Sequence, residues 1–205
     1  MTNAFLLLHG WGGNKPDHWQ EHLARELAAE GQDVHYPKMS NPTAPDPKAW
    51  MDTLHAALAA IPQDANLTVL AHSMGAINWI RHAAMAQSMG ESRPGPQAAR
   101  VLLVAPPYVV REVPPLDLAG AVGFFPPPLD KAGIALAARE TTLVESDTDD
   151  YATFDQASAY ADALGIAIEK LAGAGHISPY YGYGAWPWVR DWALGRASLP
   201  PQPNK

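Results

Sequence analysis

A serine that could act as a nucleophile lies at the centre of the segment Ala71-His-Ser-Met-Gly75. The apolar run 67–70 precedes this segment and a helical pattern follows it, which is typical of a sharp strand-to-helix turn. Such a turn needs small residues two positions on either side of the serine, and Ala71 and Gly75 meet that need. It would expose the hydroxyl of Ser73 and direct the free backbone donors of the helix toward the reacting centre. We therefore predict that Ser73 is a nucleophile; the alternative is an ordinary strand-to-helix turn.

A base and an orienting carboxylate are needed to activate a serine hydroxyl. In open α/β enzymes with this kind of turn, the chain order is serine, acid, histidine. Here acidic residues follow the predicted strand 142–145, and Gly173-Ala-Gly-His176 follows the predicted strand 166–169. The carboxyl ends of parallel strands lie at one edge of a sheet, so both loops should converge on Ser73. We predict that His176 is the general base; an exposed loop histidine is the alternative.

Three aspartates compete for the role of the acid. We predict Asp149, because it lies four residues beyond Glu145 at the loop tip and two residues before Tyr151, where the loop turns toward the next helix. Asp150 is the alternative, and Asp147 is expected to cap the turn. Each of the three could instead be a solvated loop charge or a helix N-cap.

Acyl transfer also requires hydrogen-bond donors for the oxyanion of the tetrahedral intermediate. The amide of Met74, directly after the serine, is the first predicted donor. The second is expected from the loop His9-Gly-Trp-Gly-Gly13, where Gly10 lets the backbone approach the site and Trp11 gives its N–H. A phosphate-binding loop is the competing interpretation, but the sequence contains neither Gly-x-Gly-x-x-Gly nor Gly-Lys-Ser/Thr.

Several loop residues around the predicted site are candidates for a substrate pocket, with ordinary packing as the alternative. They are Gly10, His72, Tyr108, Phe124, Tyr180 and Trp186. His18 and His22 have a helical spacing that can bind zinc, but the order His-Glu-x-x-His is absent. We expect no metal and no other cofactor.

Alternating strand and helix patterns must position these residues, and they predict an α/β fold with a parallel sheet covered on both faces. The predicted strands are 5–8, 33–36, 67–70, 101–104, 142–145 and 166–169. The predicted helices are 19–29, 47–60, 76–89, 154–164 and one near 188–194. Seven prolines interrupt the region 106–130, which we interpret as a fixed loop or small lid at the rim of the site, with a plain surface excursion as the alternative.

Composition limits the kind of protein further. A chain of 205 residues is expected to form one domain, here 1–195, followed by a polar, proline-rich tail over 196–205. The net charge of −7 and the lack of a Lys/Arg cluster argue against nucleic acid or an anionic membrane as partner. There is no cysteine for disulfides or thiol chemistry. Neither a signal peptide nor a membrane span is recognisable, so a cytoplasmic location is expected.

Four motifs together give a specific resemblance. They are Leu8-His-Gly-Trp-Gly-Gly, Ala71-His-Ser-Met-Gly, Ser146-Asp-Thr-Asp-Asp-Tyr and Gly175-His-Ile-Ser-Pro followed by Gly184-Ala-Trp-Pro. Over 5–194 the chain resembles the small serine hydrolases typified by retinoblastoma-binding protein nine. The resemblance implies a single-domain α/β-hydrolase with a mainly parallel six-stranded sheet, little or no cap, and a triad of Ser73, Asp149 and His176. The family pattern has glycine where Ala71 stands and proline where Asp150 stands, so Asp149 and Asp150 remain open as the acid.

These observations favour a serine hydrolase that cleaves a small carboxylic ester through an acyl-enzyme. An aminopeptidase-like amide hydrolase is the close alternative, although the sequence assigns no carboxylate to hold a free amino group. A protein-binding module with vestigial catalysis is the alternative from another class. A protein partner is not indicated by the sequence, and the physiological substrate is not specified by it.

Overall fold

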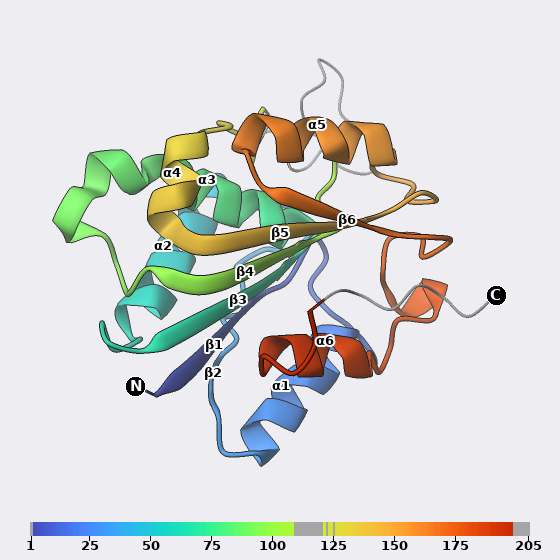
Figure 1. Cartoon of the computed structure of the whole chain (residues 1–205), viewed down its shortest axis with the longest axis horizontal. Coiled ribbons are helices and arrows are strands. Elements are labelled where there is room, and N and C mark those ends of the chain that lie inside the picture. Colours follow the sequence, from blue (N-terminus) through green and yellow to red (C-terminus); the bar gives the residue numbers. More distant parts are fainter. Residues whose placement is uncertain (1, 109–120, 122, 125, 199–205) are drawn as a thin grey trace.

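A six-stranded sheet forms the centre of the computed structural model (Figure 1), which describes residues 2–108, 121, 123, 124 and 126–198. The strands are β1 (Asn3–Leu8), β2 (Asp33–His35), β3 (Asn66–His72), β4 (Ala98–Val104), β5 (Ala138–Ser146) and β6 (Ala167–Leu171). Their order is β2-β1-β3-β4-β5-β6, and all five neighbouring pairs are parallel. The carboxyl ends of β3, β5 and β6 therefore lie at the same edge of the sheet.

Helices cover both faces of this sheet, as predicted (Figure 1). They are α1 (Trp19–Ala29), α2 (Pro47–Ala59), α3 (Met74–Met89), α4 (Lys131–Ala137), α5 (Phe154–Leu164) and α6 (Pro187–Ala193). Short 3-10 turns occur at Gly90–Ser92 and Pro179–Tyr181. One apolar cluster joins the sheet to α2, α3, α4 and α5, and a second joins the other face to α1 and α6. The predicted α/β fold class with a parallel sheet is confirmed.

The helix boundaries follow from local chemistry. Asp46 caps α2 by accepting a hydrogen bond from the amide of Ala49 at 2.7 Å, and Pro47 occupies the first turn, where no backbone donor is needed. Thr153 and Gln156 form a reciprocal capping box at the start of α5. Gly165 ends α5 with φ of +66°, a left-handed conformation that a residue without Cβ adopts freely.

Two elements, α4 and β5, differ most from the prediction made from the sequence. The helix α4 was not predicted, because its seven residues, Lys131–Ala137, give too short a pattern to distinguish from a loop. Strand β5 begins at Ala138, four residues before the predicted start. The charged residues Arg139 and Glu140 near the start of β5 are not typical of a strand. In the structure, however, β5 is paired with β4 from Ala138 onward, with Ala138 opposite Ala98. Pairing with a buried neighbour therefore extends the strand.

Parts of two predictions fall on residues outside the described ranges. Of the proline-rich region 106–130, residues 109–120, 122 and 125 are not described, so the lid interpretation and the absence of a cap stay predictions. The tail is described only as far as 198. Among the described residues, every helix is too short or too polar to span a lipid bilayer.

Candidate active site

The backbone at Ser73 forms a strained turn between β3 and α3. Ser73 has φ of +54° and ψ of −124°, a combination that non-glycine residues rarely adopt. Its amide donates to the carbonyl of Val104 at 2.9 Å, which ties the turn to the neighbouring strand. A Cβ on Gly75 would overlap the carbonyl oxygens of Leu8 and His9, so the start of α3 can pass this close to β1 only with glycine. The turn thus holds the Ser73 hydroxyl at the carboxyl edge of the sheet.

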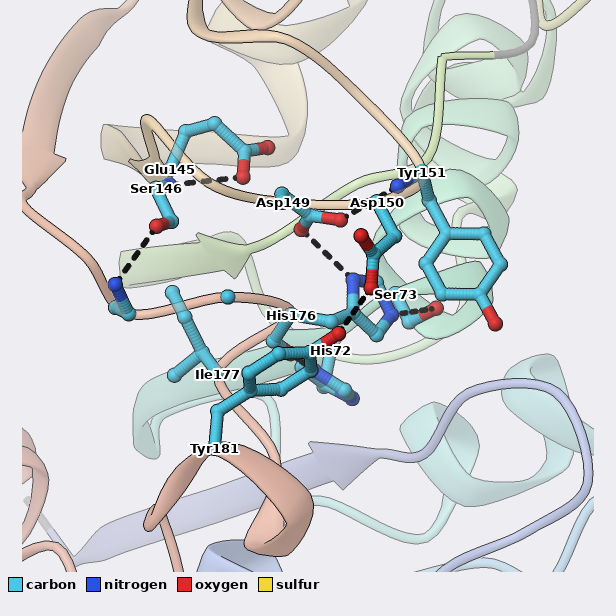
Figure 2. Close-up of polar contacts among 12 residues, drawn as sticks. His72, Ser73, Glu145, Ser146, Asp149, Asp150, Tyr151, His176, Ile177 and Tyr181 are labelled. Carbon is cyan, nitrogen blue, oxygen red and sulfur yellow. Dashed lines mark hydrogen bonds and ion pairs between the residues drawn. The ribbon is translucent and has the colours of Figure 1, made fainter.

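The side chains of Ser73, His176 and Asp149 lie in hydrogen-bonding series (Figure 2). His176 Nδ1 lies 2.8 Å from Asp149 Oδ2, and His176 Nε2 lies 3.0 Å from Ser73 Oγ. A carboxylate only accepts, so Nδ1 donates to Asp149. In the neutral ring Nε2 is then the acceptor, and the Ser73 hydroxyl donates to it. A hydroxyl held in this way can pass its proton to the imidazole as it attacks an electrophile.

The two aspartates left open by the sequence lie in different surroundings. The Asp149 side chain is 1% exposed, and its Oδ1 accepts the amide of Tyr151 at 2.7 Å. Asp150 instead accepts a hydrogen bond from the hydroxyl of Tyr181 (Figure 2). Asp149 is therefore the one that contacts His176, and each of its two carboxylate oxygens accepts a hydrogen bond.

The loop that carries Asp149 is bonded to the loop that carries His176 through three consecutive side chains. Ser146 Oγ, Asp147 Oδ1 and Thr148 Oγ1 accept the amides of Ala174, Gly173 and Gly175 at 2.9, 2.8 and 3.0 Å, respectively. We call Ser146, Asp147 and Thr148 the latch. Because it fixes one loop on the other, the latch holds the distance between the carboxylate and the imidazole.

Two further features direct the His176 side chain inward. Gly175 has φ of +54°, and a Cβ there would overlap the ring of Tyr181. Ile177 also has a positive φ, +47°, and its carbonyl accepts a hydrogen bond from the indole of Trp19 at 3.1 Å. Trp19 at the start of α1 therefore holds a loop that lies more than 150 residues later in the chain.

Three histidine rings pack together at the site. The ring centroids of His18 and His72 are 4.9 Å apart, and those of His72 and His176 are 5.0 Å apart. Burial and the neighbouring His176 lower the pKa of His18 to about 3. Burial, His18 and His176 lower the pKa of His72 well below its ordinary value, and His72 Nε2 donates to the carbonyl of His176 at 3.0 Å. Of the three rings, only that of His176 has a carboxylate partner to support a positive charge.

The glycine-rich loop packs directly on the serine. A Cβ on Gly10 would lie 2.8 Å from Ser73 Cβ and 3.2 Å from Ser73 Oγ, so only glycine allows this approach. His9 fixes the loop, since its Nδ1 donates to the carbonyl of Gly10 at 2.9 Å and its Nε2 accepts the amide of Met39 at 3.0 Å. Trp11 follows Gly10 at the edge of the site. Met74 is the first residue of α3, where a backbone N–H has no partner within the helix.

A cavity of about 150 Å³ opens at Ser73. It is lined by Gly10, Trp11, Gly13, Asn14, His18, His72, Ser73, Tyr151, His176 and Ser178. Of the predicted pocket residues, Gly10 and His72 lie on its wall. The predicted oxyanion donor Trp11 lies there as well, whereas the Met74 side chain is fully buried in the core.

The other four predicted pocket residues lie elsewhere. Phe124 is fully buried and packs edge-on against Trp50 at 5.4 Å, so it belongs to the core under α2. Tyr108 packs against Tyr160 of α5 at 5.5 Å. Tyr180 is 89% exposed, and Trp186 packs against Trp19 at 5.5 Å. Each of these aromatic rings finds its contacts on a neighbouring element or in solvent rather than at the cavity.

Four residues that line the cavity were not predicted as part of the site: Asn14, His18, Tyr151 and Ser178. Each lies within a few residues of a recognised motif. Asn14 directly follows Gly12-Gly13, Tyr151 follows the aspartate pair, and Ser178 lies two residues after His176. Their closeness to the motifs in the sequence could have identified these residues as part of the cavity wall. A search for polar residues near the motifs would have found more of them than the search for aromatic residues did.

The described part of the chain contains no cluster of three or more His, Asp or Glu side chains with the geometry to hold a metal ion. His18, one member of the His18/His22 pair, instead caps α1, because its Nδ1 accepts the amide of Gln20 at 3.2 Å.

The chain is similar to several known proteins. The chain is 23% identical over 194 residues to YdeN of Bacillus subtilis (strain 168), a protein assigned to the hydrolases, and the match covers 93% of this chain and 94% of YdeN. The crystal structure of the ydeN gene product superposes with a TM-score of 0.77 at 22% identity, over 95% and 98% of the two chains. The N-formylmaleamic acid deformylase of Pseudomonas putida S16 superposes with a TM-score of 0.60 at 19% identity, over 88% of each chain.

These two structural likenesses, both below 25% identity, show the α/β-hydrolase fold. The family model is more specific, because it matches residues 5–193, nearly the whole chain. By this match the chain belongs to the serine hydrolase family, and it is a hydrolase.

Proposed function

We propose that this protein cleaves small carboxylic esters through an acyl-enzyme formed on Ser73. The observation that carries the proposal is the uninterrupted series from Ser73 Oγ through His176 to Asp149, with separations of 3.0 and 2.8 Å. This is the connectivity that a serine nucleophile, a general base and an orienting acid require.

Each residue then has a defined task. Ser73 Oγ attacks the carbonyl carbon while its proton passes to His176 Nε2. His176 gives this proton to the oxygen of the leaving alcohol, and the carbon–oxygen bond breaks. Water then attacks the acyl carbon and gives a proton to His176 Nε2. The bond from this carbon to Ser73 Oγ breaks, His176 returns the proton to Ser73 Oγ, and the carboxylic acid leaves. Asp149 holds the imidazole in the tautomer with hydrogen on Nδ1, and the amides of Trp11 and Met74 bind the oxyanion.

The volume and the lining of the cavity favour a substrate with a short acyl group. A volume of about 150 Å³ is on the scale of a cavity that holds one benzene molecule. Among the described residues, the side chains that line the cavity include no carboxylate and no lysine or arginine. A substrate with a free amino group would find no counter-charge there, which favours a neutral ester over an aminopeptidase substrate.

A fluorophosphonate probe tests the proposed nucleophile. It should label the wild-type protein covalently, and the variant Ser73→Ala should not be labelled. Ser88→Ala is the matched control, since Ser88 is exposed on α3 and its hydroxyl only donates to the carbonyl of Met85. If the folded wild type is not labelled, the proposal is wrong and a binding role for the fold gains support. If Ser73→Ala is still labelled, another residue is the nucleophile and the proposal is wrong as well.

A series of nitrophenyl esters tests the substrate class. We expect kcat/KM to be highest for acyl chains of about two to four carbons and to fall for chains of about eight carbons, because the cavity cannot enclose them. Amides of the same acyl groups form the comparison series. Faster cleavage of the amides would assign the protein to amide hydrolysis instead.

A further inference from the structure

A second carboxyl group lies buried beside Asp149. Glu145 is the penultimate residue of β5 and is fully inaccessible to solvent. One of its oxygens, Oε1, accepts the amide of Ser146 at 2.9 Å. The other, Oε2, finds no N–H or hydroxyl partner among the described residues. Figure 2 shows the Glu145 carboxyl turned toward the loop of Asp149.

Figure 2 draws the carboxyl groups of Glu145 and Asp149 next to each other, and the charge of Asp149 acts on Glu145. Two carboxylates only accept, so they can bond to each other only through a proton held by one of them. Both oxygens of Asp149 already accept hydrogen bonds, one from His176 and one from Tyr151. Glu145 has one backbone donor and complete burial, so the proton belongs on Glu145.

Among the described residues, Asp149 is the charged group that acts on Glu145. Its register partner on β6 is Lys170, whose ammonium lies over the ring of Phe154 and 3.8 Å from Asp147 at the surface. On α5, which packs against β5, the acidic residues Asp155 and Asp162 are exposed. The buried Tyr160 of that helix donates to the carbonyl of Pro107 at 3.1 Å, and β4 contributes apolar residues at this end.

We propose that Glu145 is a positioning residue for the proposed triad: a neutral carboxyl whose Oε2–H donates a hydrogen bond to the carboxylate of Asp149. This inference rests on the proposed function for its effect on catalysis. The proton stays on Glu145 throughout, and no bond to substrate is made. A carboxylic acid held neutral in an apolar site can serve as a hydrogen-bond donor in this way.

Electrostatics support the assignment. Burial, together with the charge of Asp149, raises the pKa of Glu145 to about 10. Glu145 is therefore neutral throughout the range in which the enzyme would work, and the buried pair carries a single negative charge. By accepting a hydrogen bond from Glu145, Asp149 has less charge to offer the imidazolium form of His176.

Two variants of Glu145 separate the proposed role from its alternatives. Glu145→Gln keeps the size, the neutral state and a donor to Asp149, so the acid limb of the kcat/KM profile against pH should coincide with that of wild type. Glu145→Leu keeps the volume but removes the donor, so Asp149 stabilises the imidazolium more. The midpoint of the acid limb should then rise by about half a unit to one unit, corresponding to a three- to tenfold change in proton affinity.

Each other outcome overturns the proposal. If Glu145 were ionised, both variants would remove a negative charge and lower the midpoint. If Glu145 only filled space, neither variant would move it. Glu140→Leu is the matched control, because Glu140 is exposed on the same strand, and it should leave the midpoint in place.

Infrared spectroscopy gives a readout that does not depend on activity. At neutral pH the wild type should show the carbonyl band of a protonated carboxyl group, and Glu145→Gln should lack it. A missing band in wild type overturns the proposal. A band that is present in a protein that no fluorophosphonate labels would leave the carboxyl pair in place and refute the proposed serine hydrolysis instead.

Discussion

His176 and His82 are both held through the Nδ1 atom of the ring, yet their partners differ. His176 Nδ1 bonds to Asp149 at 2.8 Å, and its Nε2 faces Ser73 in the cavity. His82, on α3, places Nδ1 3.1 Å from Nε2 of His55 on α2 and is 2% exposed. A carboxylate supports a positive charge on its imidazole, whereas a second imidazole opposes it.

Burial and the imidazole partner of His82 lower its proton affinity. Burial and His55 lower the pKa of His82 to about 3, so His82 stays neutral in the folded protein. A buried, hydrogen-bonded histidine is thus a structural residue unless a carboxylate and an open cavity accompany it.

Removal of the two imidazoles should have opposite consequences. His176→Ala should lower kcat by a factor on the order of 10⁵ to 10⁶, because base and nucleophile act as a unit, with little change in melting temperature. His82→Ala should keep most of the activity but lower the free energy of unfolding by about 1–3 kcal/mol, since it leaves a cavity and an unpaired His55. Ester kinetics and thermal denaturation on the same samples measure both. Equal loss of activity in the two variants would contradict the contrast.

Replacement of Asp149 should leave His176, like His82, without a carboxylate partner at Nδ1. Asp149→Asn should lower kcat by a factor on the order of 10⁴, because the amide no longer fixes the Nδ1–H tautomer. Asp150→Asn should have a small effect, since Asp150 contacts Tyr181 rather than His176. Steady-state kinetics of the two isosteric variants decide the assignment, and the reverse order of effects would make Asp150 the acid.

The buried His82 should make stability depend on pH. Its pKa is lower in the folded protein, so the unfolded chain binds a proton first and stability falls as the pH decreases from about 6.5 toward 3. Between pH 7 and pH 5 the loss due to this residue is about 2 kcal/mol. Urea denaturation at both pH values should show a smaller loss for His82→Leu than for wild type. An identical loss would mean that His82 does not titrate as described.

Loss of one hydrogen bond of the latch should have the smallest effect on stability and activity. Thr148→Val removes the acceptor for the amide of Gly175, which should lower the free energy of unfolding by about 1 kcal/mol and kcat/KM by a few-fold. Thr148→Ser retains the hydroxyl and is the control. Chemical denaturation and ester kinetics test both effects. Wild-type values in Thr148→Val would show that the Asp149 and His176 loops hold their distance without this contact.

Local patterns in the sequence were enough to predict most of the fold. In the described part of the chain, all six predicted strands and all five predicted helices are present near their predicted positions. Buried parallel strands give continuous apolar runs, and helices such as α2 and α5 begin with capping residues. The short α4 and the charged start of β5 at Ala138 gave no such pattern. Both are stabilised by packing and pairing with residues distant in the sequence.

The candidate site divides in a similar way. Ser73 and His176 could be selected from the sequence because each lies in a motif with a required geometry. The roles predicted for Trp11 and Met74 as oxyanion donors remain predictions. The pocket could not be predicted from residue type, since Phe124 and Trp186 are aromatic residues that pack against Trp50 and Trp19 instead.

The sequence by itself determined the order of strands and helices, the turn that carries Ser73, and the edge of the sheet at which the acidic and histidine loops end. These features depend on local backbone preferences and on the alternation of strands and helices, which makes the strands parallel. Only the tertiary structure decided that Asp149 rather than Asp150 contacts His176, and that Glu145 is buried beside it. Both depend on the directions of side chains in a loop, which are fixed by contacts with residues more than 20 positions away.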